Sequence, residues 1–174
     1  MRVAMCIFAL GSLAAGVSRG AVQNPIVEAH ADNKGQMHIR MKDGAEKVIP
    51  ADKEQVGADG IKISPDGSAV GWMVEVPNCC TSYPIPVSIM VYSARGKLQR
   101  FGDGMMIGDW KFLEGGRKIA YNTDTVHSNL APQCALVEIS TGKTLGHWQR
   151  GDGPLPTWAQ GFADQVGSTT NEAH

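Results

Sequence analysis

Three similar segments, each an alternating run that ends at a glycine, place the strongest constraint on how this chain folds. The segments are Met37–Gly44, Ile89–Gly96 and Ala135–Gly142, and their final glycines lie 52 and 46 residues apart. Alternation of apolar and polar residues is typical of a half-buried β-strand, and a following glycine is typical of a tight turn. Self-similarity with a period of about 50 residues indicates stacked repeats, each built from a small β unit.

A second pair of segments repeats in a different register. Ile61–Trp72 aligns with Trp110–Tyr121 at a constant offset of 49 residues. In each copy two short alternating runs flank a turn, which in the first copy is Ser64–Ser68 (Ser-Pro-Asp-Gly-Ser). Proline presets φ at the second turn position and glycine tolerates a positive φ, so the pattern predicts an antiparallel hairpin. Each unit then has four strands, expected in the middle unit near residues 60–64, 69–76, 87–93 and 97–101.

The position of a strand residue relative to its turn glycine predicts the sheet face that it occupies, because side chains alternate between the two faces. Residues with the same parity in the three copies are therefore expected to form one inward column. These residues are Ile39, Val91 and Val137, with Met37, Ile89 and Ala135 beside them.

These segments resemble the TolB-like (WD40-like) β-propeller repeat. The resemblance is carried by Ile61–Trp72, Asp109–Tyr121 and Val137–Lys143, although Leu113–Gly116 replaces the Ser-Pro-Asp-Gly turn in the second copy. It implies an all-β fold of about three four-stranded antiparallel blade-like units, forming a partial or dimer-completed β-propeller. It also implies a bacterial protein and an interaction platform, although such repeats occur as accessory domains of enzymes too.

The two ends of the chain together hold the remaining unit. Strands are expected at 25–29, 37–41 and 46–49, without a first strand, and Leu155–Phe162 places Trp158 where the next first strand belongs. This segment can complete the N-terminal unit of its own chain, or that of a second copy in a six-bladed homodimer. Association with another propeller fragment is a third possibility. The alternative is an irregular segment, because Pro154 and Pro156 weaken strand character.

Residues 1–20 have the pattern of a secretory signal peptide, with a lone Arg2, an apolar run over Val3–Ala15 and small residues before the cleavage point. A membrane anchor is the alternative. We expect a repeat domain over 21–165 and a flexible tail over 166–174. Loss of Arg2 and Arg19 lowers the basic count from 16 to 14 against 17 acidic residues, a net charge of −3. This balance argues against nucleic-acid or membrane-surface binding and fits a periplasmic or extracellular protein.

Three cysteines remain after the signal peptide: Cys79, Cys80 and Cys134. An oxidising compartment favours a disulfide, and a bond from Cys79 or Cys80 to Cys134 would join neighbouring units. A strained Cys79–Cys80 bond is the alternative. The same three cysteines with His127 are also candidate ligands for zinc or copper, although their spacing matches no established metal motif.

Catalytic motifs for an activated serine, a zinc hydrolase or a phosphate loop are absent from the sequence. Loop aspartates such as Asp109 and Asp152 are candidates for carboxylate chemistry or Ca²⁺, or form turns. We therefore expect a non-enzymatic binding or scaffolding module without a cofactor, acting through a protein partner or self-association. The alternative is a small secreted enzyme or metal-binding protein that uses the 77–86 and 122–134 loops.

Overall fold

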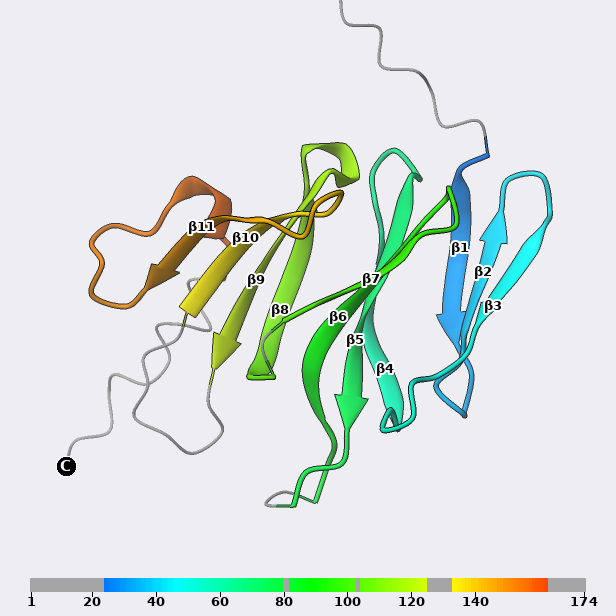
Figure 1. Cartoon of the computed structure of the whole chain (residues 1–174), viewed down its shortest axis with the longest axis horizontal. Helices are drawn as coiled ribbons and strands as arrows, with labels where there is room; N and C mark the ends of the chain where they lie inside the picture. The colour runs from blue at the N-terminus through cyan, green and yellow to red at the C-terminus, as the bar shows by residue number, and fades with distance from the viewer. Residues whose placement is uncertain (1–23, 80–81, 103, 125–132, 163–174) are drawn as a thin grey trace, which may run out of the picture.

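The computed structural model describes residues 24–79, 82–102, 104–124 and 133–162, and these residues form three antiparallel β-sheets. Figure 1 shows the sheets side by side in chain order. The first sheet contains β1 (Ile26–Ala31), β2 (Met37–Met41) and β3 (Glu46–Ile49). The second contains β4 (Gly57–Ile63), β5 (Ala69–Val76), β6 (Ile85–Ser93) and β7 (Leu98–Phe101). The third contains β8 (Met106–Leu113), β9 (Lys118–Asp124), β10 (Gln133–Glu138) and β11 (Thr144–Gln149).

The architecture confirms the predicted all-β class with three blade-like units. Strands that follow one another in sequence are hydrogen-bonded neighbours in every sheet, in the orders β1-β2-β3, β4-β5-β6-β7 and β11-β10-β9-β8. The second sheet has its four strands where the sequence pattern placed them. Within the described residues the first sheet has three strands, and the position beside β1 that would correspond to β4 or β8 is not filled. The predicted signal peptide (1–20) and tail (166–174) lie outside the described residues.

The Ser64–Ser68 turn joins β4 to β5 and also fixes the first sheet against the second. Within the turn, the Asp66 carboxylate accepts hydrogen bonds from the Ser64 hydroxyl (2.8 Å) and the Ser68 amide (2.9 Å). Gly67 has a φ of 68° and its carbonyl accepts a hydrogen bond from the Ile26 amide at 2.8 Å. A β-carbon at Gly67 would lie 2.6 Å from that of Pro25, so the close approach of the two sheets requires glycine here.

The second sheet is apolar on both faces. One face turns Val70, Trp72 and Val74 toward Met37 and Ile39 of the first sheet. The opposite face packs against the third sheet, through the cluster Ala69, Met73, Ile89, Val91, Phe101, Ile107, Trp110, Ile119, Tyr121, Val137 and Ile139. Burial of both faces explains why residues 69–74 of β5 are a continuous apolar run rather than a strictly alternating pattern.

The predicted inward column is buried, but it does not lie on one equivalent face. Ile39 and Val91 each face the sheet that follows in the chain, whereas Val137 faces the second sheet, which precedes it. The cause is the turn: the Gly96 amide bonds to the carbonyl of Ser93, three residues earlier, whereas the Gly142 amide bonds to Glu138, four residues earlier. One extra turn residue shifts the alignment by one position, and such a shift exchanges the two faces.

Residues 155–162 do not form the predicted closing strand and do not pair with the first sheet. They form a short 3₁₀ turn, η2 (Thr157–Ala159), and cover the outer face of the third sheet. Ala159 and Phe162 are buried there against Ala120, Cys134 and Trp148. The prolines disfavour a strand, and the apolar face of a last sheet needs a cover, so this segment packs as a cap on its own chain.

The double burial of the second sheet predicts the effect of a charge at Val91, whose side chain is 1% exposed. Val91→Asp should prevent cooperative folding, because an unpaired carboxylate in an apolar interface costs about 4 kcal/mol or more. Val48→Asp is the matched control, since Val48 lies on a strand but is 43% exposed. Thermal unfolding followed by circular dichroism measures both variants. An unchanged melting temperature for Val91→Asp would disprove the inter-sheet packing.

Candidate functional site

The residues proposed as metal ligands or disulfide partners are only partly described by the structure. Cys79 is exposed after β5, and Cys134 is buried in β10. Cys80 and His127 lie outside the described residues. Cys79 and Cys134 are not joined by a disulfide. Across the described ranges, no group of three or more His, Cys, Asp or Glu side chains is placed to hold a metal ion.

Cys134 points away from the sheet to which the predicted disulfide would connect it. Its side chain packs with Ala120, Trp148 and Phe162 under the C-terminal cap, on the face of the third sheet that is turned away from the second. Burial raises the pKa of its thiol to about 11. The thiolate is the form that binds metals and attacks disulfides, so this environment favours an unreactive core thiol.

A groove opens between the second and third sheets, on the side of the molecule where their outer strands lie. We call it the seam groove, and its volume is about 360 Å³. The second sheet supplies β7 and the residue after it as one wall, and the third sheet supplies the other wall. The lining residues are Arg100, Phe101, Gly102, Tyr121, Thr123, Gln133, Cys134, Ala135, Val137, Gly142, Thr144 and His147.

The register of the third sheet explains the lining of the seam groove. Strand pairing places Ala135 between Tyr121 and His147, and it places Val137 between Ile119 and Thr144. Each of these cross-strand rows runs from a buried aromatic or aliphatic residue on β9 to a polar residue on the edge strand β11. His147 and Gln133 form a hydrogen bond of 3.1 Å. The wall formed by the third sheet therefore has an apolar floor and a polar rim.

The electrostatics of the seam groove are close to neutral. Arg100 is the only Lys, Arg, Asp or Glu among its lining residues, and its guanidinium forms an ion pair with Asp52. The turn end of the seam is closed by a hydrogen bond from the Lys97 ammonium to the Ser140 carbonyl, at 3.1 Å. Such a site offers hydrogen bonds and apolar contact to a ligand.

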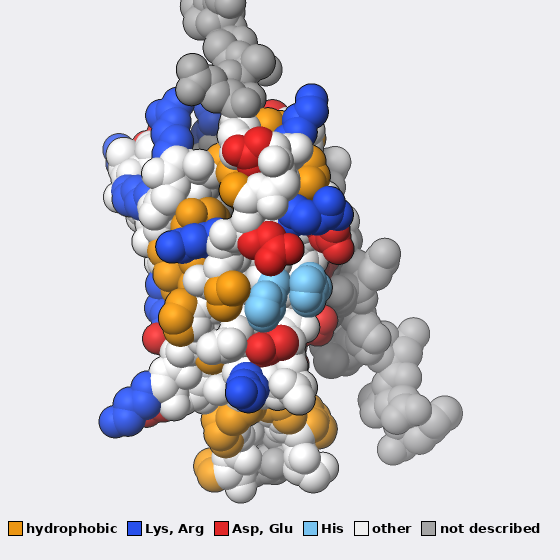
Figure 2. All heavy atoms as spheres, turned by 90° about the vertical axis from the view of Figure 1, so that its right-hand side faces the viewer, with side chains coloured by type: hydrophobic (Ala, Val, Ile, Leu, Met, Phe, Trp, Pro, Cys, Tyr) orange, Lys and Arg blue, Asp and Glu red, His pale blue; other side chains and the backbone are white. Residues whose placement is uncertain are grey.

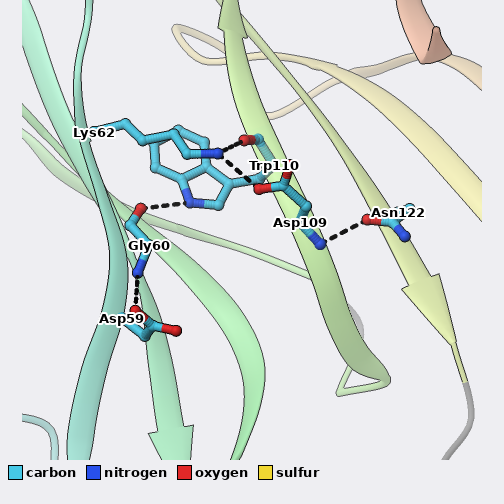
Figure 3. Close-up of polar contacts among 6 residues, drawn as sticks. All are labelled: Asp59, Gly60, Lys62, Asp109, Trp110 and Asn122. Atoms are coloured by element: carbon cyan, nitrogen blue, oxygen red, sulfur yellow. Dashed lines mark hydrogen bonds and ion pairs between the residues drawn. The ribbon is translucent and has the colours of Figure 1, made fainter. Parts of the chain in front are cut away.

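A second polar cluster lies between β4 and β8 and has a structural role (Figure 3). The Lys62 ammonium donates to the Asp109 carboxylate at 2.7 Å and to the Trp110 carbonyl, and the Trp110 indole N–H donates to the Gly60 carbonyl at 2.9 Å. Asp109, a candidate for carboxylate chemistry, is thus committed to an ion pair. Asp152 accepts a hydrogen bond from the Gln149 amide at 3.0 Å within a turn, as the turn-forming interpretation predicted.

Three residues of the seam groove were not predicted as site residues from the sequence: Gln133, Thr144 and His147. A signal was present, because all three lie on the face of the third sheet that is turned toward the second, where continuing burial would require apolar residues. These residues can be assigned to the groove face only when the register of β10 is known. The longer turn at Gly142 hides that register in the sequence.

No protein-family model matches the chain, and no curated protein matches it. Among solved structures, the β-propeller domain of the Trilobed protease from Pyrococcus furiosus is similar, with a TM-score of 0.46 and 14% sequence identity. The alignment covers 74% of this chain and 43% of that one, so this chain spans less than half of the matched protein's length. The described residues also contain no helix of the length and hydropathy needed to cross a membrane.

The buried position of Cys134 predicts its reactivity. In the folded protein at about pH 8, Cys134 should resist iodoacetamide, because its raised pKa keeps the thiol protonated and the cap covers it. At pH values between the ordinary thiol pKa of 9.0 and about 11, the unfolded thiol loses its proton while the folded thiol keeps it. This group therefore lowers the free energy of unfolding as the pH rises through that range.

Alkylation followed by peptide mass spectrometry, before and after unfolding without reductant, measures this reactivity. Modification of Cys134 only after unfolding is expected. Rapid modification of Cys134 in the folded protein would contradict its burial, and resistance even after unfolding would instead reveal the disulfide predicted from the sequence.

Proposed function

We propose that this chain is an exported, non-catalytic binding module that holds a short extended segment of a protein partner in its seam groove. The observation that carries the proposal is the groove itself, an inter-sheet hollow with an apolar floor and a hydrogen-bonding rim. Its volume of about 360 Å³ falls within the range of roughly 300–1,000 Å³ typical of ligand sites.

The polarity of the groove favours a peptide segment over a charged ligand. Gln133 and Thr144 present amide and hydroxyl groups, which match the N–H and C=O groups of an extended backbone. Phe101 and Val137 supply apolar surface for alternate side chains of such a segment. A phosphate or a nucleic acid would require several unpaired basic groups, whereas Arg100, the one basic lining residue, is paired with Asp52.

The walls of the groove are preformed, which lowers the entropic cost of binding. Phe101 is anchored by pairing with Ile89, and Ala135 is held between two neighbouring strands. Strand-borne side chains keep their positions better than loop-borne ones do. A scaffolding role fits this arrangement, because a rigid platform fixes the geometry of what it binds.

Export is supported by the pattern of residues 1–20 and by the resemblance to TolB-like repeats, which occur as interaction platforms. On this proposal the mature chain begins at Ala21 and acts in the periplasm or outside the cell. The alternative, a small secreted enzyme or metal-binding protein that uses the 77–86 and 122–134 loops, gains no support from the described residues of these loops. Residues 80–81 and 125–132 lie outside the described part of the chain.

Filling the groove should abolish peptide binding. Thr144 is exposed on β11 and lines the groove, so Thr144→Trp occupies the site without disturbing the core. Leu145→Trp is the matched control, because Leu145 is the next residue, is 42% exposed and does not line the groove. The probe is the best binder selected from a phage-displayed library of unstructured peptides.

Isothermal titration calorimetry measures the affinity of the selected peptide for the unmodified protein and for both variants. We expect Thr144→Trp to weaken binding at least about tenfold, a change of about 1.4 kcal/mol, and Leu145→Trp to leave it within about twofold. Equal binding by both variants, or a library without any binder, would refute the proposal.

A further inference from the structure

The outer face of the first sheet, turned away from the second sheet, differs in composition from every inter-sheet face. Strand alternation sends Ala29, Met37 and Ile39 into the core, and it sends Glu28, His30, His38, Arg40 and Glu46 to the outside. Figure 2 views this side and shows two histidine side chains next to each other, with acidic side chains above and below them. The outer faces of the first and third sheets therefore differ. Residues 155–162 cover the outer face of the third sheet, whereas the outer face of the first sheet is polar and exposed.

The two histidines are fixed next to each other by the pairing of β1 with β2. His30 lies directly opposite His38 in the antiparallel register. Their ring centroids are 5.1 Å apart and the ring planes differ by 7°, so the imidazoles stack. The backbone ladder thus holds two metal-binding side chains side by side. Because parallel rings point their nitrogens in parallel planes, the imidazoles must turn about their Cβ–Cγ bonds to share one ion.

A carboxylate is in place to orient one of these rings. The Asp32 carboxylate lies 3.5 Å from Nε2 of His38. Asp32 is itself held at the end of β1, because its other oxygen accepts hydrogen bonds from the amides of Lys34 (2.8 Å) and Gln36 (2.9 Å). Histidines that bind metals commonly donate their second ring nitrogen to a carboxylate, and this contact leaves Nδ1 of His38 for a ligand.

Both histidines line a small hollow of about 80 Å³, together with Glu28, Ile39, Arg40 and Glu46. Arg40 forms an ion pair with Glu28, so its positive charge is compensated. Glu46 and Asp32 add further negative charge beside the imidazoles. The local field therefore favours a cation over an anion.

We propose that His30 and His38 form a two-imidazole site for a divalent transition cation, Zn²⁺, Ni²⁺ or Cu²⁺, with Asp32 as the positioning carboxylate. Imidazole nitrogen suits these metals, whereas Mg²⁺ and Ca²⁺ prefer oxygen ligands. Water completes the coordination of such a two-ligand site. The site is separate from the seam groove and from the Cys79, Cys80, His127 and Cys134 set, and it does not depend on the proposed function.

Titration calorimetry of the full chain with NiCl₂ and with ZnCl₂ tests the site, using His30→Asn and His38→Asn as single variants. Both positions lie on the solvent side of the sheet, so each variant should keep the melting temperature of the parent protein. We expect each substitution to remove one equivalent of metal or weaken its binding at least about tenfold, because one imidazole alone does not chelate. Gln149→Asn, at an exposed position of β11 outside the seam groove, is the control and should leave the metal stoichiometry and affinity unchanged.

Two further readouts separate this site from other histidines and cysteines of the chain. Asp32→Asn should weaken binding less than the histidine substitutions do, since it removes the orienting group and keeps both ligands. Lowering the pH to about 5 should release the metal, because protons compete with metal ions for imidazole nitrogens. Metal stoichiometry and affinity that survive both His30→Asn and His38→Asn would overturn the proposal.

Discussion

The packing of Trp110 across the seam between the second and third sheets is the interaction on which the rest of the structure depends. Its side chain is 0% exposed, and its indole N–H bonds to the Gly60 carbonyl at 2.9 Å. A β-carbon at Gly71 would lie 2.6 Å from the indole Cη2 atom, so the ring reaches β5 only because Gly71 has no side chain. Burial of roughly 200 Å² of aromatic surface contributes about 5 kcal/mol, whereas the half-exposed ion pair between Lys62 and Asp109 contributes about 1 kcal/mol or less.

The seam that Trp110 closes on one side remains open on the other, and this asymmetry connects the fold to the proposed function. Near β4 and β8 the two sheets are joined by the indole, the ion pair and apolar packing. Beside β7, the residues of β10 and β11 that face the second sheet become polar, at Gln133, Thr144 and His147, and the seam groove remains. Stability therefore resides in the inner part of the interface, and the outer part is where we propose that a partner binds. The outer faces of the end sheets are likewise specialised, one covered by Phe162 and the other carrying the His30–His38 pair.

Much of this fold could be predicted from the sequence, because strand alternation and turn chemistry act locally. The strands of the second sheet, the absence of a first strand before β1 within the described residues, and the burial of Ile39, Val91 and Val137 were all predictable in this way. The face of Val137 was not predictable, because one additional residue in the Gly142 turn reverses parity without changing the local pattern. The role of residues 155–162 was also missed, since their apolar residues suit a strand and a cap equally. The seam groove escaped prediction because its residues come together only when two sheets pack.

A double-mutant cycle between Gly71→Ala and Trp110→Phe tests the central claim most directly, with the free energy of unfolding measured by urea denaturation. Alanine is otherwise compatible with a strand at position 71, so its cost in the parent protein should arise from the collision with the indole and amount to about 1–3 kcal/mol. Phenylalanine lacks the second ring that approaches Gly71, so the same substitution in the Trp110→Phe background should cost less than about 0.5 kcal/mol. Coupling of at least about 1 kcal/mol between the two sites is the predicted result. Strictly additive effects would show that Trp110 does not cross the seam to Gly71, and would contradict the packing of the second and third sheets described above.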